Sequence, residues 1–289
     1  MRVISTYVLL ACREGTGGVM RQITVATVQM TPVLSDVDAN IERMGKWVED
    51  ICREQKVDVI VFPELVTSGY ECGVRFADLA ERVPGHVVDY MSKRAADFGV
   101  HLAFGLAEKE KVESIIYDSA VLIDSEGEVV ATYRKVHLRG EERLAFRPGY
   151  RFVSSETSVG TVGLLLGWDL AFPEAARCLA LQGAELICVC ASWERPHTAA
   201  WSHYLFSRAL ENTVYVTAAN RVGEEYTYSF FGSSGVIGPQ GEVCSSMDEE
   251  VEGYAVATID LDDVRRVRED SQILQLRQPR SYRDIVKMY

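Results

Sequence analysis

Residues 164–177 read "LLLGWDLAFPEAAR" and contain the pattern that recurs along the chain. An apolar run enters it, an acidic turn with a proline follows, and an alanine-rich segment leaves it, which is the pattern of a strand, a tight corner and a helix start. Gly167 occupies the corner, and the loops after strands are where sites assemble in α/β sheets. Because glycine has no side chain, any chemistry at this corner depends on the residues that converge on it.

The same strand-and-helix rhythm extends in both directions from this corner. Residues 23–30 alternate as a strand, and residues 36–55 place Ile41, Met44, Val48 and Ile51 on one face of a helix. Further segments repeat the order of strand, helix, strand and hairpin in each half of the chain: strands at 57–64 and 100–110, a helix at 87–99 and a hairpin at 117–138; then strands at 161–166, 184–192 and 213–223, helices at 173–182 and 198–212, and a hairpin around 238–243. Two such halves predict an α/β fold in which two sheets pack face to face with helices outside.

The two ends of the chain differ from this pattern. Residues 1–19 contain one short apolar run, "STYVLLAC" at 5–12, with only Arg2 before it, which is weak for a signal segment. We interpret residues 1–19 as an N-terminal extension, disordered or from a misassigned start, and residues 20–289 as a single domain. The charged segment from about residue 263 is expected to form a C-terminal arm.

Composition narrows the class of function. The chain has 289 residues, 47% hydrophobic and 25% charged, and a formal net charge of -12. A nucleic acid or an anionic membrane surface needs a basic patch, and this chain has no run of Lys or Arg. It also lacks the roughly 20 continuous apolar residues of a membrane span. We therefore expect a cytoplasmic protein that acts on a small molecule.

The seven cysteines are scattered without metal-ligand spacing. Cys188 and Cys190 lie two apart in an apolar run, where a strand would direct both to one face. Reduced thiols in the core are the interpretation that we favour over disulfides or a metal site.

Polar residues follow or end several apolar strands: Glu64, Lys135, Asp169 and Asn220. A glutamate at a buried strand exit is desolvated, which raises its pKa and suits it to act as a base. A lysine nearby would stabilise a developing oxyanion. Taken alone, each of these residues could equally be an ordinary exposed polar residue at the end of a strand.

In combination and in order, these stretches resemble the nitrilase superfamily of carbon–nitrogen hydrolases from about residue 23 to 289. The matching motifs are "VFPELVTSGY", "YDSAVLIDSEGEVVATYRKVHL", "EERLAFRPG", "GWDLAFPEAARCLALQGAELICVCASW", "RALENTVYVTAANRVG" and "RQPRSYRDI". The resemblance implies a four-layer αββα sandwich that assembles into homodimers or larger homo-oligomers. It implies no cofactor and no metal.

The resemblance also implies a Glu-Lys-Cys triad. Matched by motif, Glu64 is the general base and acid, Lys135 stabilises the tetrahedral intermediate, and Glu142 orients Lys135 or the substrate. The position of the nucleophilic cysteine falls on Gly167, with its surroundings intact. Two interpretations follow: an inactivating replacement of the cysteine in an enzyme that still binds substrate, which we favour, or a native pseudoenzyme that binds amides or partners.

Substrate contacts are expected from Trp168 and from the segment 191–201, with Trp193, Glu194 and His197 as candidates. Glu194 together with Arg195 would suit a substrate that carries an extra polar or charged group. An amide is our default substrate, and N-carbamoyl compounds and nitriles remain open.

A metal-dependent phosphoesterase is the alternative from another class of enzyme. It would place Glu64, Asp169, Glu174 and Asn220 around Mg²⁺. The chain has five histidines, none in a spaced ligand motif, which disfavours this alternative.

Overall fold

The computed structural model describes residues 21–111, 115–247 and 250–287, so the predicted extension at 1–19 lies outside the described residues. The described chain contains two six-stranded sheets and one two-stranded sheet. The first sheet contains β1 (Gln22–Gln29), β2 (Val59–Val61), β3 (His101–Lys109), β4 (Ile116–Ile123), β5 (Val129–Arg134) and β14 (Gly253–Asp260). The second contains β6 (Ser154–Thr157), β7 (Gly160–Leu166), β8 (Leu186–Ala191), β9 (Tyr215–Asn220), β12 (Gly235–Ile237) and β13 (Val243–Ser246). A small separate ribbon pairs β10 (Val222–Glu224) with β11 (Ser229–Phe231).

The two large sheets have matching topologies. The first runs in the order β14-β1-β2-β3-β4-β5, with β1, β2 and β3 parallel. The second runs β13-β12-β9-β8-β7-β6, with β7, β8 and β9 parallel. In each sheet a parallel centre is flanked by antiparallel strands, as the repeated order of strand, helix, strand and hairpin predicts.

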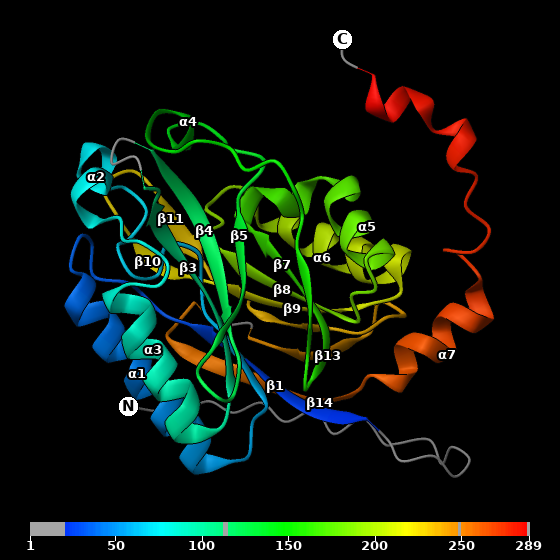
Figure 1. The fold of residues 1–289 in the computed structure, drawn as a ribbon, viewed down its shortest axis with the longest axis horizontal. Coiled ribbons are helices and arrows are strands. Elements are labelled where there is room, and N and C mark those ends of the chain that lie inside the picture. Colours follow the sequence, from blue (N-terminus) through cyan, green and yellow to red (C-terminus); the bar gives the residue numbers. More distant parts are fainter. Residues whose placement is uncertain (1–20, 112–114, 248–249, 288–289) are drawn as a thin grey trace.

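Helices cover the outer face of each sheet (Figure 1). On the first sheet lie α1 (Val37–Glu54) and α3 (His86–Phe98), and on the second lie α5 (Pro173–Leu181) and α6 (Thr198–Asn212). The remaining helical elements of the described chain are η1 (Gly73–Arg75), α2 (Phe76–Leu79), α4 (Glu142–Ala145), η2 (Gly167–Ala171), α7 (Asp262–Ser271), η3 (Pro279–Ser281) and η4 (Arg283–Val286). Each sheet therefore has one face for helices and one face for the other sheet.

Three buried clusters correspond to the three interfaces between these layers. The central cluster joins side chains of both sheets, for example Val61 of β2 and Leu166 of β7, and it includes Cys188 and Cys190. One outer cluster packs the first sheet against α1 and α3, and the other packs the second sheet against α5 and α6. The predicted αββα sandwich is confirmed, and so is the prediction that both cysteines of β8 face one side.

Two features near the C-terminus were not predicted. Strand β14 pairs antiparallel with β1 along its whole length, from Gln22 opposite Asp260 to Gln29 opposite Gly253. Helix α7 then buries Val264 in the cluster between the sheets. The exposed arm consequently begins after Ser271, and not at about residue 263; in Figure 1 it extends from the body in red.

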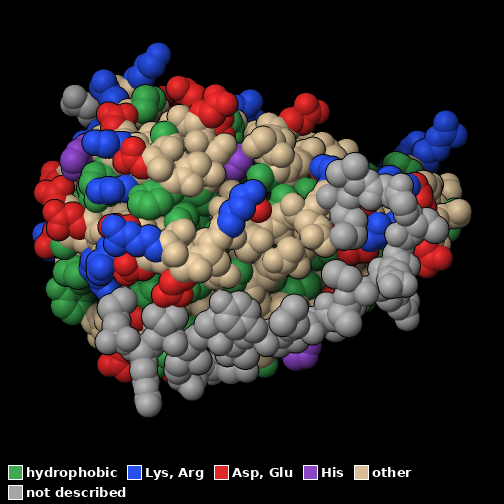
Figure 2. Space-filling view, turned by 90° about the horizontal axis from the view of Figure 1, so that it is seen from below, with side chains coloured by type: hydrophobic (Ala, Val, Ile, Leu, Met, Phe, Trp, Pro, Cys, Tyr) green, Lys and Arg blue, Asp and Glu red, His purple; other side chains and the backbone are tan. Residues whose placement is uncertain are grey.

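The distribution of charged side chains on the surface agrees with the absence of Lys or Arg runs in the sequence. On the face shown in Figure 2, basic side chains lie interspersed with acidic ones. No described helix has the length and apolar character needed to cross a membrane.

Candidate active site

Glu64 lies just after β2, where the chain turns between the two sheets. Its neighbour Leu65 has a φ of +46°, and the turn passes so close to β3 that a Cβ on Gly105 would lie 2.6 Å from the Glu64 Cα. The backbone N–H of Ser192, the residue after β8, donates to Glu64 Oε2 at 2.9 Å, and the Ser192 hydroxyl donates to the Glu64 carbonyl at 2.9 Å. Both sheets therefore fix this side chain, which is only 1% exposed.

Lys135 follows β5 and is also 1% exposed. Its Nζ donates to Glu64 Oε1 at 2.7 Å and to Glu142 Oε1 at 2.6 Å. Burial opposes its charged form, but the negative charges of Glu142 and Glu64 outweigh burial and raise the pKa of Lys135 well above its usual range. The ammonium group is therefore a fixed positive charge.

Glu142 begins α4 and completes the group. Besides Lys135, it accepts from the Tyr70 hydroxyl at 2.5 Å and from the Arg139 backbone N–H at 2.9 Å. Burial raises the pKa of Glu64 above its usual range, and the charge of Lys135 only partly opposes this shift. A carboxyl with a raised pKa, beside a permanent cation, is suited to take up and return a proton.

Gly167 follows β7 directly and begins η2, at the corner after a strand that the sequence predicts. It is buried with a φ of +34°, and a Cβ built on it would lie 2.5 Å from Glu64 Oε2 and 2.6 Å from Oε1. The Glu64 carboxylate thus occupies the space that a side chain at residue 167 would need. Any larger residue here requires Glu64 to withdraw and the corner to leave a backbone conformation that suits glycine.

A pocket opens over Glu64, Lys135, Glu142 and Gly167, with aromatic and charged side chains around it. The rings of Trp168 and Trp193 lie 5.1 Å apart, and Glu194 also contributes to the wall. The free space is about 10 Å³, roughly enough for one water molecule. The wall must therefore move before an amide can enter.

Three further pocket residues were not predicted: Tyr70, Arg139 and Ser192. The Arg139 guanidinium lies 4.3 Å from the Trp168 ring, 3.2 Å from Glu194 Oε1 and 2.7 Å from His197 Nε2. His197 is therefore held beside the pocket through Arg139 and does not itself line it. In the sequence, Arg139 could have been found from its position three residues before Glu142, whose carboxylate its backbone N–H contacts.

The expectation that Arg195 joins Glu194 in the pocket is wrong. Arg195 forms an ion pair with Glu250, and both side chains are about half exposed. The pocket cation next to Glu194 is Arg139.

The four residues proposed for a magnesium site do not come together. Asp169 is buried and accepts from the Tyr133 hydroxyl at 2.6 Å and from His137 Nδ1 at 2.8 Å. The Asn220 side chain bonds to the backbone of Trp193 and Gly232, and Glu174 is exposed on α5. The side chains of Asp169 and Asn220 are thus used to bond neighbouring parts of the chain. These four residues therefore do not form a metal site.

Comparison with known proteins agrees with the fold. A family model described as carbon-nitrogen hydrolase matches residues 24–269. A protein of Schizosaccharomyces pombe named as a probable nitrilase is 43% identical over 249 residues, which cover 85% of this chain and 92% of the relative.

Two solved structures extend the comparison. A carbon-nitrogen hydrolase from Helicobacter pylori has a TM-score of 0.86 at 29% identity, over 93% of this chain and 99% of the other. A double mutant of the amidase from Nesterenkonia sp. AN1, with a glutamate changed to glutamine and a cysteine to alanine, is in complex with acrylamide; its TM-score is 0.81 at 27% identity, over 94% and 100% of the two chains.

Proposed function

This chain belongs to the carbon–nitrogen hydrolase family, and on that premise we propose that its pocket serves the hydrolysis of a small amide to a carboxylate and ammonia, with residue 167 as the position of the nucleophile. The observation that carries the proposal is the convergence of Glu64 and Lys135 on this position. A Cβ at residue 167 would lie 2.5 Å from the Glu64 carboxylate, whose other oxygen accepts from Lys135 at 2.7 Å.

With a cysteine at residue 167, the groups divide the reaction between them. Glu64 takes the thiol proton, and the thiolate attacks the amide carbon. The Lys135 ammonium stabilises the oxyanion of the tetrahedral intermediate, and Glu64 returns the proton to the departing ammonia. Water activated by Glu64 then hydrolyses the thioester, while Glu142 holds Lys135 in place.

The chain with Gly167 lacks this nucleophile. Of the thiols in the described chain, Cys190 lies in β8 between the two sheets, and burial raises its pKa well above the usual range. It does not line the pocket. We propose that Gly167 is an inactivating replacement and that the pocket retains affinity for its substrate; the amidase mutant that holds acrylamide is a relative in which a cysteine is also replaced.

A native amide-binding pseudoenzyme is the second candidate, and one observation favours it. The φ of +34° at Gly167 and the placement of Glu64 in the vacated space form a corner that accommodates glycine. In that case, the pocket binds its ligand without covalent chemistry.

The substrate class follows from the charges at the rim of the pocket. Arg139 and Glu194 form an ion pair there at 3.2 Å, so both a cation and an anion can meet a polar substituent. We propose a small amide with a second polar or charged group, such as an ω-amide or an N-carbamoyl compound.

The test is ammonia release by the Gly167→Cys protein beside the chain with Gly167, over short amides, N-carbamoyl compounds and nitriles. Gly183→Cys is the matched control, because Gly183 also has a positive φ and a Cβ there meets nothing within 4 Å. Turnover by Gly167→Cys alone supports the proposal. If neither Gly167→Cys nor the chain with Gly167 releases ammonia, and the chain with Gly167 binds a member of the panel in calorimetry, the pseudoenzyme is supported instead.

A further inference from the structure

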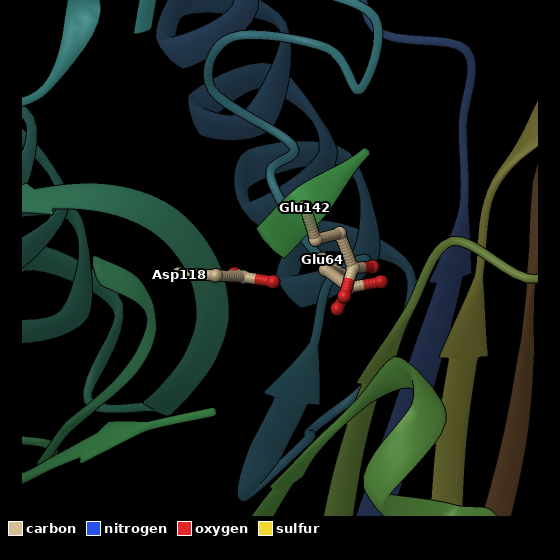
Figure 3. A group of neighbouring side chains, drawn as sticks. All are labelled: Glu64, Asp118 and Glu142. Carbon is tan, nitrogen blue, oxygen red and sulfur yellow. The ribbon is translucent and has the colours of Figure 1, made fainter. Parts of the chain in front are cut away.

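Three buried carboxyl groups share one lysine in this site. Oxygen atoms of Glu64, Asp118 and Glu142 lie within 4.8 Å of one another, and the three residues are 1%, 0% and 6% exposed (Figure 3). Lys135 supplies a single positive charge. If all three carboxyl groups were ionised, the group would hold two uncompensated negative charges away from water, which is strongly unfavourable.

A metal ion does not resolve this excess, because the position of the cation is already taken. Lys135 Nζ lies 2.6 Å from Glu142, 2.7 Å from Glu64 and 3.5 Å from Asp118. A divalent ion that used the same three carboxylates would meet the ammonium group directly. A proton on one of the three carboxyl groups reduces the excess to a single negative charge.

Hydrogen-bond donors identify the carboxyl group that carries this proton. Glu142 accepts from three donors, and Glu64 accepts from Lys135 and from the Ser192 backbone, so both are satisfied as carboxylates. Neither oxygen of Asp118 accepts a hydrogen bond from any described residue, and its 3.5 Å distance to Lys135 is too long for a strong one. A buried carboxylate without donors is the least stable of the three.

We propose that Asp118 is a positioning residue whose carboxyl group keeps its proton and donates a hydrogen bond to Glu64. The inference rests on the proposed function for its kinetic consequence only. Asp118 lies in β4, where its backbone carbonyl also accepts from the Lys135 N–H at 2.9 Å, so one residue places both the base and the ammonium group.

The electrostatics of the site agree with this assignment. Burial and the negative charge of Glu64 raise the pKa of Asp118 well above its usual range. The proposed hydrogen bond from Asp118 would oppose, in part, the rise that burial causes in the pKa of Glu64. The titratable groups that face Asp118 are Glu64 from the loop after β2, Glu142 from α4, Lys135 after β5 and the buried Cys190 thiol of β8. Lys135 is the one cation among these four groups.

The proton on Asp118 keeps Glu64 available as a base. As a donor, Asp118 stabilises the ionised form of Glu64, which can accept the proton of a thiol at residue 167. An ionised Asp118 would instead favour the protonated form of Glu64, which cannot accept one. The Asp118 proton itself stays in place during the reaction.

Infrared difference spectroscopy tests the proposal on the chain with Gly167, without any need for activity. At neutral pH, the spectrum of this chain minus that of Asp118→Asn should contain the C=O stretch of one protonated carboxylic acid, shifted in D₂O. Asp97→Asn, at an exposed position of α3, should give only carboxylate bands. A difference spectrum for Asp118→Asn that contains carboxylate bands alone would overturn the proposal.

Kinetics in the Gly167→Cys protein test the positioning role. Asp118→Ala removes the donor, so the pKa of Glu64 rises and the acidic limb of kcat/KM should move up by about one pH unit. Asp118→Asn keeps an N–H donor, and its acidic limb should stay at the parent position. Equal limbs in all three proteins, or equal shifts in both variants, would contradict the role. If Gly167→Cys shows no turnover, the proposed function fails, and the infrared result still decides the state of Asp118.

Discussion

Replacement of Lys135 by methionine is the sharpest test of the electrostatics of this site. Methionine has a similar length and keeps the packing, but it removes the ammonium group that bonds to Glu64 and Glu142 at 2.7 and 2.6 Å. Both carboxyl groups then remain buried without their cation.

The magnitude follows from the partners that remain. Loss of one partner of a buried ion pair costs about 3–5 kcal/mol. Glu142 retains donors from Tyr70 and Arg139, and Glu64 retains the Ser192 N–H. We therefore expect the low end of this range, a loss of about 3 kcal/mol in the free energy of unfolding at pH 8.

The sign of the pH dependence is fixed by the direction of the pKa shift. Burial already raises the pKa of Glu64 in the folded protein, and loss of Lys135 raises it further. A carboxyl group whose pKa is higher in the folded than in the unfolded state contributes fully to the stability of the fold at pH values below its unfolded pKa. This contribution is lost as the pH rises through the folded pKa, and it amounts to about 1.4 kcal/mol for each unit of difference between the two pKa values. The free energy of unfolding of the variant should therefore lie further below that of its parent at pH 8 than at pH 5.

Urea denaturation of parent and variant at pH 5 and pH 8 measures both quantities. Lys93→Met, on the exposed side of α3, is the matched control and should change little. Glu142→Gln added to Lys135→Met should restore part of the loss at pH 8. A loss below about 1 kcal/mol, or one equal at both pH values, would refute the account of a buried charge group.

Other positions give further expectations. Gly105→Ala should destabilise the fold by about 1–3 kcal/mol in urea denaturation, because its Cβ would lie 2.6 Å from the Glu64 Cα; an unchanged stability would contradict the close approach. In the Gly167→Cys protein, Arg139→Ala should raise KM for amides with a carboxylate substituent more than for plain amides, and equal effects would remove Arg139 from recognition. Asp169→Ala should lower the melting temperature and the activity of that protein together, since the Tyr133 hydroxyl and His137 lose their acceptor. Light scattering should give a homodimer or larger assembly, and the 32.2 kDa mass of one chain would contradict that expectation.

Local patterns in the sequence carry most of the fold. The apolar period of residues 36–55 predicts α1, and the run before Gly167 predicts β7, because each pattern reflects which face the element buries. Strand β14 was not predicted. Its partner β1 lies more than 200 residues away, and no local pattern in the sequence indicates which strand β14 pairs with.

The site divides in the same way. Glu64, Lys135 and Gly167 stand at strand ends, where the sequence alone marks them as polar or small residues in apolar company. Asp118 gives no such signal, because a polar residue in an alternating strand reads as solvent-facing until the second sheet covers it. Arg195 was misplaced because its partner Glu250 lies 55 residues further along the chain.

The most direct test of the central claim is rapid-quench mass spectrometry of the Gly167→Cys protein mixed with its best amide. We expect a transient acyl adduct on the peptide that contains residue 167, which disappears as carboxylate forms, and no adduct in the chain with Gly167. Turnover with no adduct at residue 167, or with the adduct on Cys190, would contradict the assignment of residue 167 as the position of the nucleophile.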